Sequence, residues 1–244
     1  MFDELATYYH DNVVEAFVAY RDTSRDGLAG RGRDLREAIV AASALFHLRE
    51  HLPNVIALSR LKAEKLCTDY ALLGDIVNAA KHKSITQPTP HGAPLVNNVG
   101  KLKELLLNIE YEDTEGVYRC TKKTVVATLV DGTERNLLEV LTNVMNFWES
   151  HLYRLGVFSK QRTFVFEPPV RYRTRSECEQ IRLDHQVVQG QRYQPAYQFL
   201  RFDTRTGQAR PIDLTGCKLD MRIYKPRFNF NVSLKLGMRL GIPY

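Results

Sequence analysis

The segment HLREH, residues 47–51, carries the residue types of a zinc peptidase. It matches the pattern H-x-x-E-H, in which two histidines one helical turn apart can bind zinc beside a glutamate. At 100° per residue, His47, Glu50 and His51 share one helix face, so the spacing permits a metal. A third ligand would have to come from a distant helix without a distinctive motif, and Pro53 ends this helix. We therefore expect a solvated or interface stripe, and no bound metal or other cofactor.

A second polar group lies in DYALLGDIVNAAKHKSI, residues 69–85. Helical spacing places Asp75, Asn78 and His82 on one stripe, nearly opposite an apolar face. Aspartate and asparagine are mediocre residues in the middle of a helix, because their side chains compete for backbone hydrogen bonds. The stripe is therefore either functional or the exposed polar face of a surface helix.

The positive charge is concentrated in the C-terminal part of the chain. Residues 157–244 hold 16 of the 34 Lys and Arg but only 7 of the 28 Asp and Glu, and 12 of the 16 cations are Arg. Aromatic residues alternate with cations in VRYRTR and RYQPAYQFLRF, as in surfaces that stack single-stranded bases. An Arg-rich surface that is solvated or paired with a protein is the alternative. The candidate nucleic-acid-binding residues are Arg171, Arg173, Arg175, Arg192, Arg201, Lys81 and Lys83.

Hydrophobic periodicity predicts the elements that position these residues. Four helices are expected, at residues 3–22, 34–52, 69–85 and 136–155. Asp34 and Glu37 match a capping box at the start of the second helix. A small β-hairpin is expected at about 102–131, and short alternating strands follow the last helix. The sequence therefore predicts an α+β fold, with a helical domain at 1–156 that carries the hairpin and a basic antiparallel β domain or layer at 157–244.

Cysteine spacing and hydropathy bear on the compartment. Cys67, Cys120, Cys178 and Cys217 are widely separated and form no C-x-x-C pair, so we expect reduced, structural thiols. The N-terminal segment MFDELATYYHDN has acids where a secretory signal has cations, and no apolar run approaches the length of a membrane span. We expect a cytoplasmic protein without a membrane partner.

Three segments together resemble a known family. AASALFHLREHL, LLGDIVNAAKHKSI and LLEVLTNVMNFWESHL resemble the HEPN superfamily of small helical bundles, over about residues 1–155. Its members often dimerise and include RNA-cleaving toxins and antiviral defence proteins. In active members an Arg precedes the catalytic His, with four to six residues between them. If His82 is the catalytic His, this Arg should stand at one of positions 75–77. Asp75 stands at the first of these positions and has the wrong sign to stabilise a phosphate.

The resemblance implies a HEPN-like protein that associates with nucleic acid and acts as a homodimer or as a subunit of a complex. The expected ligands are RNA or another single strand. RNase activity is doubtful because the motif Arg is absent; it would be metal-independent. The candidate catalytic residues are His82, Asn78, Asp75, His47 and Glu50, with His82 as general base. A non-enzymatic adaptor or structural subunit is the alternative. No Walker A, G-x-G-x-x-G or G-x-S-x-G pattern indicates nucleotide, dinucleotide or serine-hydrolase chemistry.

Overall fold

The chain forms two compact units, Met1–Arg210 and Pro211–Tyr244. The computed structural model describes residues 3–30, 32–82, 84–178 and 196–217 with their side chains, and beyond these only the backbone of short strands at 182–183, 187–188, 191–192, 220–225 and 230–235. The first unit extends beyond residue 156, because β8 (Ala196–Asp203) and β9 (Gln208–Pro211) from the C-terminal part belong to its sheet.

The first unit begins with helices. They are α1 (Asp3–Tyr8), the π-helix η1 (Tyr9–Val14), α2 (Glu15–Arg25), α3 (Arg33–His47), α4 (Arg60–Leu66), α5 (Thr68–His82) and α6 (Leu137–Arg154). Short 3-10 turns are η2 (Leu48–His51), η3 (Asn54–Ile56), η4 (Val99–Lys101) and η5 (Arg175–Glu177). The four predicted helices are all present, and the short α4 was not predicted. The second predicted helix ends at His47 rather than at residue 52.

The predicted cap of α3 is wrong. The N-cap is Gly32, with a φ of 65°, a left-handed conformation that glycine adopts at little cost. Asp34 is instead buried inside the first turn, where its Oδ1 lies 2.9 Å from Lys123 Nζ. An acid is favourable at this position because the positive end of the helix dipole lies there. The sequence therefore indicated correctly that a helix begins near Asp34. Its role as the ion-pair partner of Lys123 is visible only in the tertiary structure.

Five strands form a mixed, curled sheet in the order β4-β3-β2-β8-β9. They are β2 (Leu102–Asp113), β3 (Gly116–Thr128), β4 (Glu134–Asn136), β8 (Ala196–Asp203) and β9 (Gln208–Pro211). The predicted hairpin is confirmed as β2–β3, with Gly116 at its turn at a φ of 109°. β8 pairs with β2 in parallel, so the C-terminal region contributes a layer that is not purely antiparallel. Among the short strands expected after the last helix, the first alternating segment, RTFVFE at 162–167, forms no strand.

The remaining strands are short. β1 (Leu28–Ala29) pairs in parallel with β5 (Arg182–Leu183), and β6 (Val187–Val188) pairs with β7 (Gln191–Arg192). In the second unit, β10 (Asp220–Lys225) and β11 (Phe230–Lys235) form an antiparallel hairpin.

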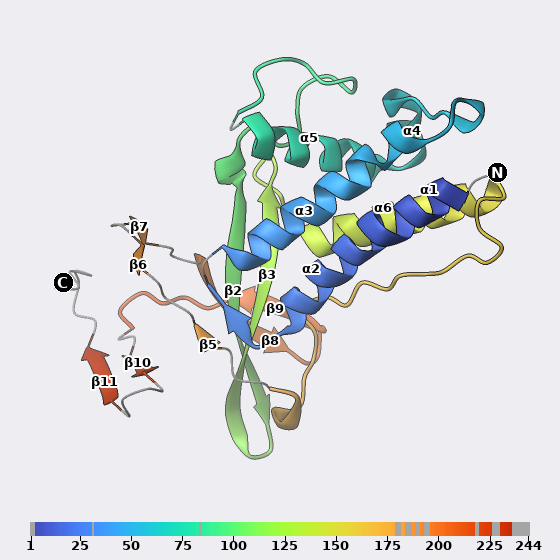
Figure 1. The fold of residues 1–244 in the computed structure, drawn as a ribbon. Helices are drawn as coiled ribbons and strands as arrows, with labels where there is room; N and C mark the ends of the chain where they lie inside the picture. Colours follow the sequence, from blue (N-terminus) through green and yellow to red (C-terminus); the bar gives the residue numbers. More distant parts are fainter. Residues whose placement is uncertain are drawn as a thin grey trace. The chain divides into compact units, whose positions relative to one another are not determined.

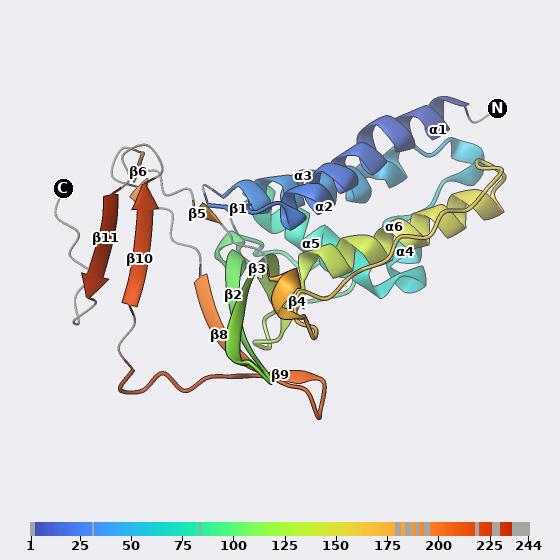
Figure 2. The same cartoon turned by 90° about the horizontal axis from the view of Figure 1, so that it is seen from below.

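The β2–β3 hairpin joins two apolar cores. One end of it packs against the helices, which run side by side, and its tip extends beyond them (Figures 1 and 2). Leu102 and Val125 belong to the core between helices and sheet, which also holds Trp148. Alternate strand residues such as Ile109 face a second, smaller core with Phe202 of β8. This alternation follows from the two-residue period of a strand and lets one hairpin serve both cores.

A disulfide links Cys120 of β3 to Cys178, 58 residues further along the chain. The expectation of four reduced thiols is therefore wrong for this pair, and the cysteine spacing carried no signal of it. Cys67 and Cys217 are free thiols. Because disulfides persist mainly in oxidising compartments, the cysteines no longer support a cytoplasmic location. Among the residues with a described structure, none of the helices combines the length and apolar character required to traverse a bilayer.

Candidate functional site

HLREH does not form one continuous α-helical face. α3 ends at His47, and the rest of the segment is the 3-10 turn η2. His47 Nδ1 lies 3.1 Å from Glu50 Oε2, whereas the ring of His51 stacks on Tyr8 with 3.7 Å between centroids. The two histidines therefore have different partners. Within the described part of the chain, no group of three or more acidic, His or Cys side chains is placed to hold a metal ion.

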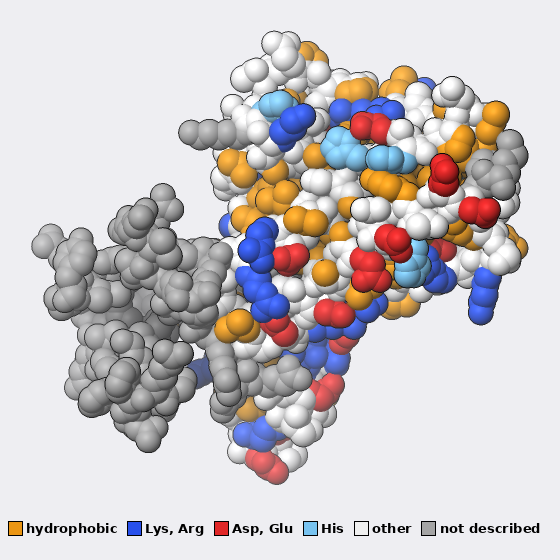
Figure 3. Space-filling view, viewed as in Figure 1, with side chains coloured by type: hydrophobic (Ala, Val, Ile, Leu, Met, Phe, Trp, Pro, Cys, Tyr) orange, Lys and Arg blue, Asp and Glu red, His pale blue; other side chains and the backbone are white. Residues whose placement is uncertain are grey.

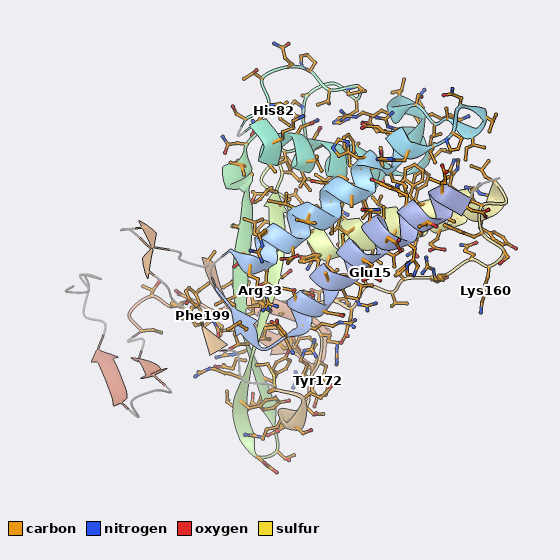
Figure 4. The ribbon with its side chains drawn as sticks, in the orientation of Figure 1. Glu15, Arg33, His82, Lys160, Tyr172 and Phe199 are labelled. Carbon is orange, nitrogen blue, oxygen red and sulfur yellow. A yellow bond between two sulfur atoms is a disulfide. The ribbon has the colours of Figure 1, made fainter. Side chains whose placement is uncertain are left out.

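The polar stripe of α5 is divided by burial. Asp75 is fully buried, Asn78 is half-buried and His82 is exposed at the end of the helix (Figure 4). The interpretation of this stripe as one exposed polar face is therefore wrong for Asp75. The α5 face that packs against the bundle is wider than the apolar residues alone indicate, because it includes a carboxylate that finds polar partners.

Asp75 belongs to a cluster of ion pairs that fixes the loop after α5. Its Oδ2 accepts hydrogen bonds from the Leu95 backbone N–H at 2.7 Å and from His91 Nε2 at 3.0 Å. His91 Nδ1 lies 3.3 Å from Glu64 Oε2, and Glu64 accepts from Arg60 Nε at 2.7 Å. Burial raises the pKa of Asp75, while these hydrogen bonds and charges oppose the increase. The cluster holds a loop in place, and its hydrogen bond to Asp75 engages His91 Nε2, whereas His91 Nδ1 makes no hydrogen bond to a described residue.

The structure does not bring His47 and Glu50 beside His82 within one chain. Phe46 lies against Gly74, because a Cβ added at Gly74 would be 2.7 Å from the Phe46 ring. His82 is eight residues further along α5, which is about 12 Å along the helix axis. Only a second copy of the chain could unite the candidate catalytic residues.

The predicted nucleic-acid-binding residues fall into different environments. Arg175 pairs with Asp113 at 2.8 Å beside the hairpin turn, and Arg201 pairs with Glu110 at 2.8 Å on the sheet. Lys81 is exposed near the end of α5. The side chain of Arg192 and the whole of Lys83 lie outside the described residues. Arg171 and Arg173 are brought together at one cavity.

This cavity has a volume of about 490 Å³, within the range of small-molecule sites. Its walls are the end of α2, strand β3, the start of α6 and the segment 166–177. Among the described residues, five cations and three carboxylates line it: Arg25, Lys122, Lys123, Arg171, Arg173, Asp26, Glu167 and Glu177. The net charge of its walls is therefore +2.

Two of these cations are neutralised inside the protein. Lys123 Nζ, which is buried, contacts Asp26 Oδ1 at 2.6 Å and Asp34 Oδ1 at 2.9 Å. Arg171 pairs with Glu167 at 2.6 Å and with Glu177 at 3.2 Å. The hydrogen bond from Arg171 holds the pKa of Glu167 below its usual value. Both cations hold the walls of the cavity in place, and their charges are already paired with carboxylates of the protein, which leaves them poorly suited to bind a ligand.

Arg173 differs from them. Its side chain is 9% exposed, yet its guanidinium donates no hydrogen bond to a described residue, and its Nε is buried without a partner. Its nearest acid is Glu167, whose Oε1 lies 3.8 Å from Nη2 and already pairs with Arg171. A buried cation is costly unless it is paired and hydrogen-bonded. An anion in the cavity would supply what the protein does not.

Two further groups on the cavity wall can donate hydrogen bonds. Tyr20 is 1% exposed, and its hydroxyl has no hydrogen-bond partner in the described part of the chain. Burial and the charges of Asp34 and Glu104 raise its pKa, so the hydroxyl keeps its proton. Arg25 is exposed at the end of α2 and makes no hydrogen bond or ion pair with a described residue. Neither Tyr20 nor Arg25 was singled out from the sequence.

The sequence offered little to find this site. Arg173 was marked only as one cation among many, and its burial depends on the path of segment 166–177. That path is set by Tyr111 and Tyr118, whose hydroxyls donate to the carbonyl oxygens of Arg171 and Arg173 at 2.7 and 2.5 Å. These contacts span 60 and 55 residues of sequence, which no local pattern encodes.

Comparisons with protein-family models, with curated protein sequences and with solved structures find no match for this chain. Its activity has to be inferred from its own residues and contacts.

Proposed function

We propose that this protein is a HEPN-like, nucleic-acid-associated protein that binds a single strand at the cavity of Arg173. The observation that carries the proposal is the nine-tenths-buried Arg173 side chain, which donates no hydrogen bond to a described residue and lies at the wall of a cavity with net positive charge. Arginine is the side chain best suited to hold a phosphate, because its planar fork can donate two parallel hydrogen bonds.

The only support that the helices give to the HEPN-like assignment is their number and order along the chain. Four long helical segments occur in the expected order, with the β2–β3 hairpin inserted before α6. A role in a toxin or antiviral defence module rests on the resemblance alone. Cleavage of RNA is not proposed, because Asp75 is committed to the His91 ion cluster and His82 stands apart from His47. Association of two copies through the exposed end of α5 remains part of the proposal.

The test is a binding measurement with a labelled single-stranded oligonucleotide at low and moderate salt. We expect binding to weaken as salt rises, since phosphate contacts release counterions. The Arg173→Met variant should bind at least tenfold more weakly, because it loses the cation but keeps a similar apolar stem. Its matched control is Arg205→Gln, which removes one positive charge from the exposed turn between β8 and β9 and should bind like the parent. Equal affinity of Arg173→Met and the parent, or no binding at low salt, would refute the proposal.

A non-enzymatic adaptor or complex subunit is the second candidate. Three large apolar side chains are exposed in the neighbouring segments η3 and α4: Val55 (71%), Leu61 (47%) and Leu66 (53%). Hydrophobic side chains are also visible over the α4 region in Figure 3. Exposed apolar side chains that gather in one region are typical of protein interfaces. Native mass spectrometry of the protein from its own host distinguishes the two, since an adaptor retains a protein partner and no nucleic acid.

A further inference from the structure

The charge on the cavity wall indicates which kind of phosphate it fits. The net charge of its described lining residues is +2. A terminal phosphate monoester carries about −1.5 to −2 at pH 7, whereas each phosphate inside a strand carries about −1. A monoester therefore neutralises the walls more completely than an internal phosphate does.

The available donors come from two parts of the chain that line the same cavity. Arg25 comes from α2, Arg173 from the segment that closes the cavity, and Tyr20 from the preceding turns of α2. The start of α6, an 18-residue helix, also reaches the cavity through Asn136 and Leu138. At that end of α6 the Asn136 side chain already accepts hydrogen bonds from the N–H groups of Leu138 and Glu139, so the helix forms part of the wall and supplies no free donor. The donors available to an anion are therefore Arg173, Arg25 and the Tyr20 hydroxyl.

The size of the cavity limits what else can enter. A volume of about 490 Å³ equals the space of roughly 16 water molecules at about 30 Å³ each, enough for one nucleotide and too little for several. Phe166 and Pro169 give part of the wall an apolar surface, on which a base or sugar can pack. The cavity therefore accommodates a phosphate with one attached nucleoside.

We propose that the cavity binds a phosphate monoester of a nucleoside, either a free nucleotide or the phosphorylated end of a single strand. This inference rests on the proposed function and adds to it the recognition of a terminal phosphate. Arg173 and Arg25 bind the phosphate oxygens, and the Tyr20 hydroxyl donates to one of them. Arg171 is a positioning residue that holds Glu167 away from the phosphate.

The experiment compares one oligonucleotide, labelled at its 3′ end, with and without a 5′-phosphate. We expect the phosphorylated form to bind at least tenfold more tightly. Arg173→Met and, separately, Arg25→Gln should reduce that preference to less than about threefold, whereas Arg205→Gln should leave it unchanged. Arg25 is exposed, so its variant tests the site without disturbing a buried residue.

The outcomes separate this inference from the proposed function. Equal binding of both forms, with loss in Arg173→Met, overturns the phosphate preference and leaves the proposed function standing. No binding of either form overturns both. Competition with a nucleoside 5′-monophosphate then identifies the source. Displacement shows that a free nucleotide suffices, and failure to displace shows that the strand end is needed. Either result supports the proposal when the unphosphorylated nucleoside does not compete.

Discussion

Glu104 of β2 is a buried acid whose ionisation should lower the stability of the folded state. It is 8% exposed, and its Oε1 accepts a hydrogen bond from the Leu35 backbone N–H at 2.8 Å, at the start of α3. Burial raises its pKa to about 7; the hydrogen bond from Leu35 opposes this and the nearby Asp34 adds to it. The ordinary pKa of a glutamate side chain is 4.5, so the folded state binds more protons than the unfolded state between these values.

The sign and size of the effect follow from linkage. Because the folded pKa is raised, the free energy of unfolding falls as the pH rises from about 4.5 through about 7. Each unit of pKa difference is worth about 1.4 kcal/mol, so the full loss is about 3 kcal/mol. Glu104→Gln removes the titration, and its amide oxygen can still accept from Leu35. We expect the variant to be more stable than the parent by about 3 kcal/mol near pH 8 and equally stable near pH 4.

The assay is urea unfolding followed by the fluorescence of Trp148, the single tryptophan, which is fully buried in the larger core. The midpoint is measured from about pH 4 to pH 8 for the parent and for Glu104→Gln. Glu112→Gln is the matched control, because Glu112 lies on the same strand and is exposed. If the unfolding midpoints of the parent and of Glu104→Gln change with pH in parallel, ionisation of Glu104 does not lower the stability of the folded state. That result would contradict the prediction.

Three further changes test other parts of the structure. Cys178→Ala should lower the free energy of unfolding by roughly 2–4 kcal/mol, because the link to Cys120 closes a loop over a separation of 58 residues; alkylation under non-reducing conditions should label two thiols in the parent and three in the variant. Gly74→Ala should destabilise by about 1–3 kcal/mol in urea unfolding despite its better helix propensity, since the new Cβ would lie 2.7 Å from the Phe46 ring; an unchanged midpoint would contradict this packing. His82→Ala should change stability by no more than about 0.5 kcal/mol and weaken self-association, as measured by melting temperature and light-scattering mass; a large fall in melting temperature would show that His82 is a core residue.

The sequence alone determined the four long helical segments, the inserted hairpin and the presence of strands after the last helix. These elements carry strong local signals, because helical and strand periodicities place apolar residues on one face. The α+β class followed from their order. The limit of the first unit did not, since the parallel pairing of β8 with β2 joins Leu105 to Ala196 across a long stretch of chain. Periodicity says that a strand has a buried face but does not say which strand lies beside it.

Only the tertiary structure decided which polar residues are buried and which have a charged partner. Asp75 and His82 belong to the same predicted stripe, yet Asp75 is buried beside His91 and His82 is exposed. Arg173 and Arg201 are alike in the sequence, but Arg201 has a carboxylate partner at 2.8 Å and Arg173 is enclosed without a close one. The physical reason is that burial and electrostatic pairing depend on partners distant in the chain. The residue types supplied the cations of the candidate site, and long-range packing decided which of them is buried without a hydrogen bond to a described residue.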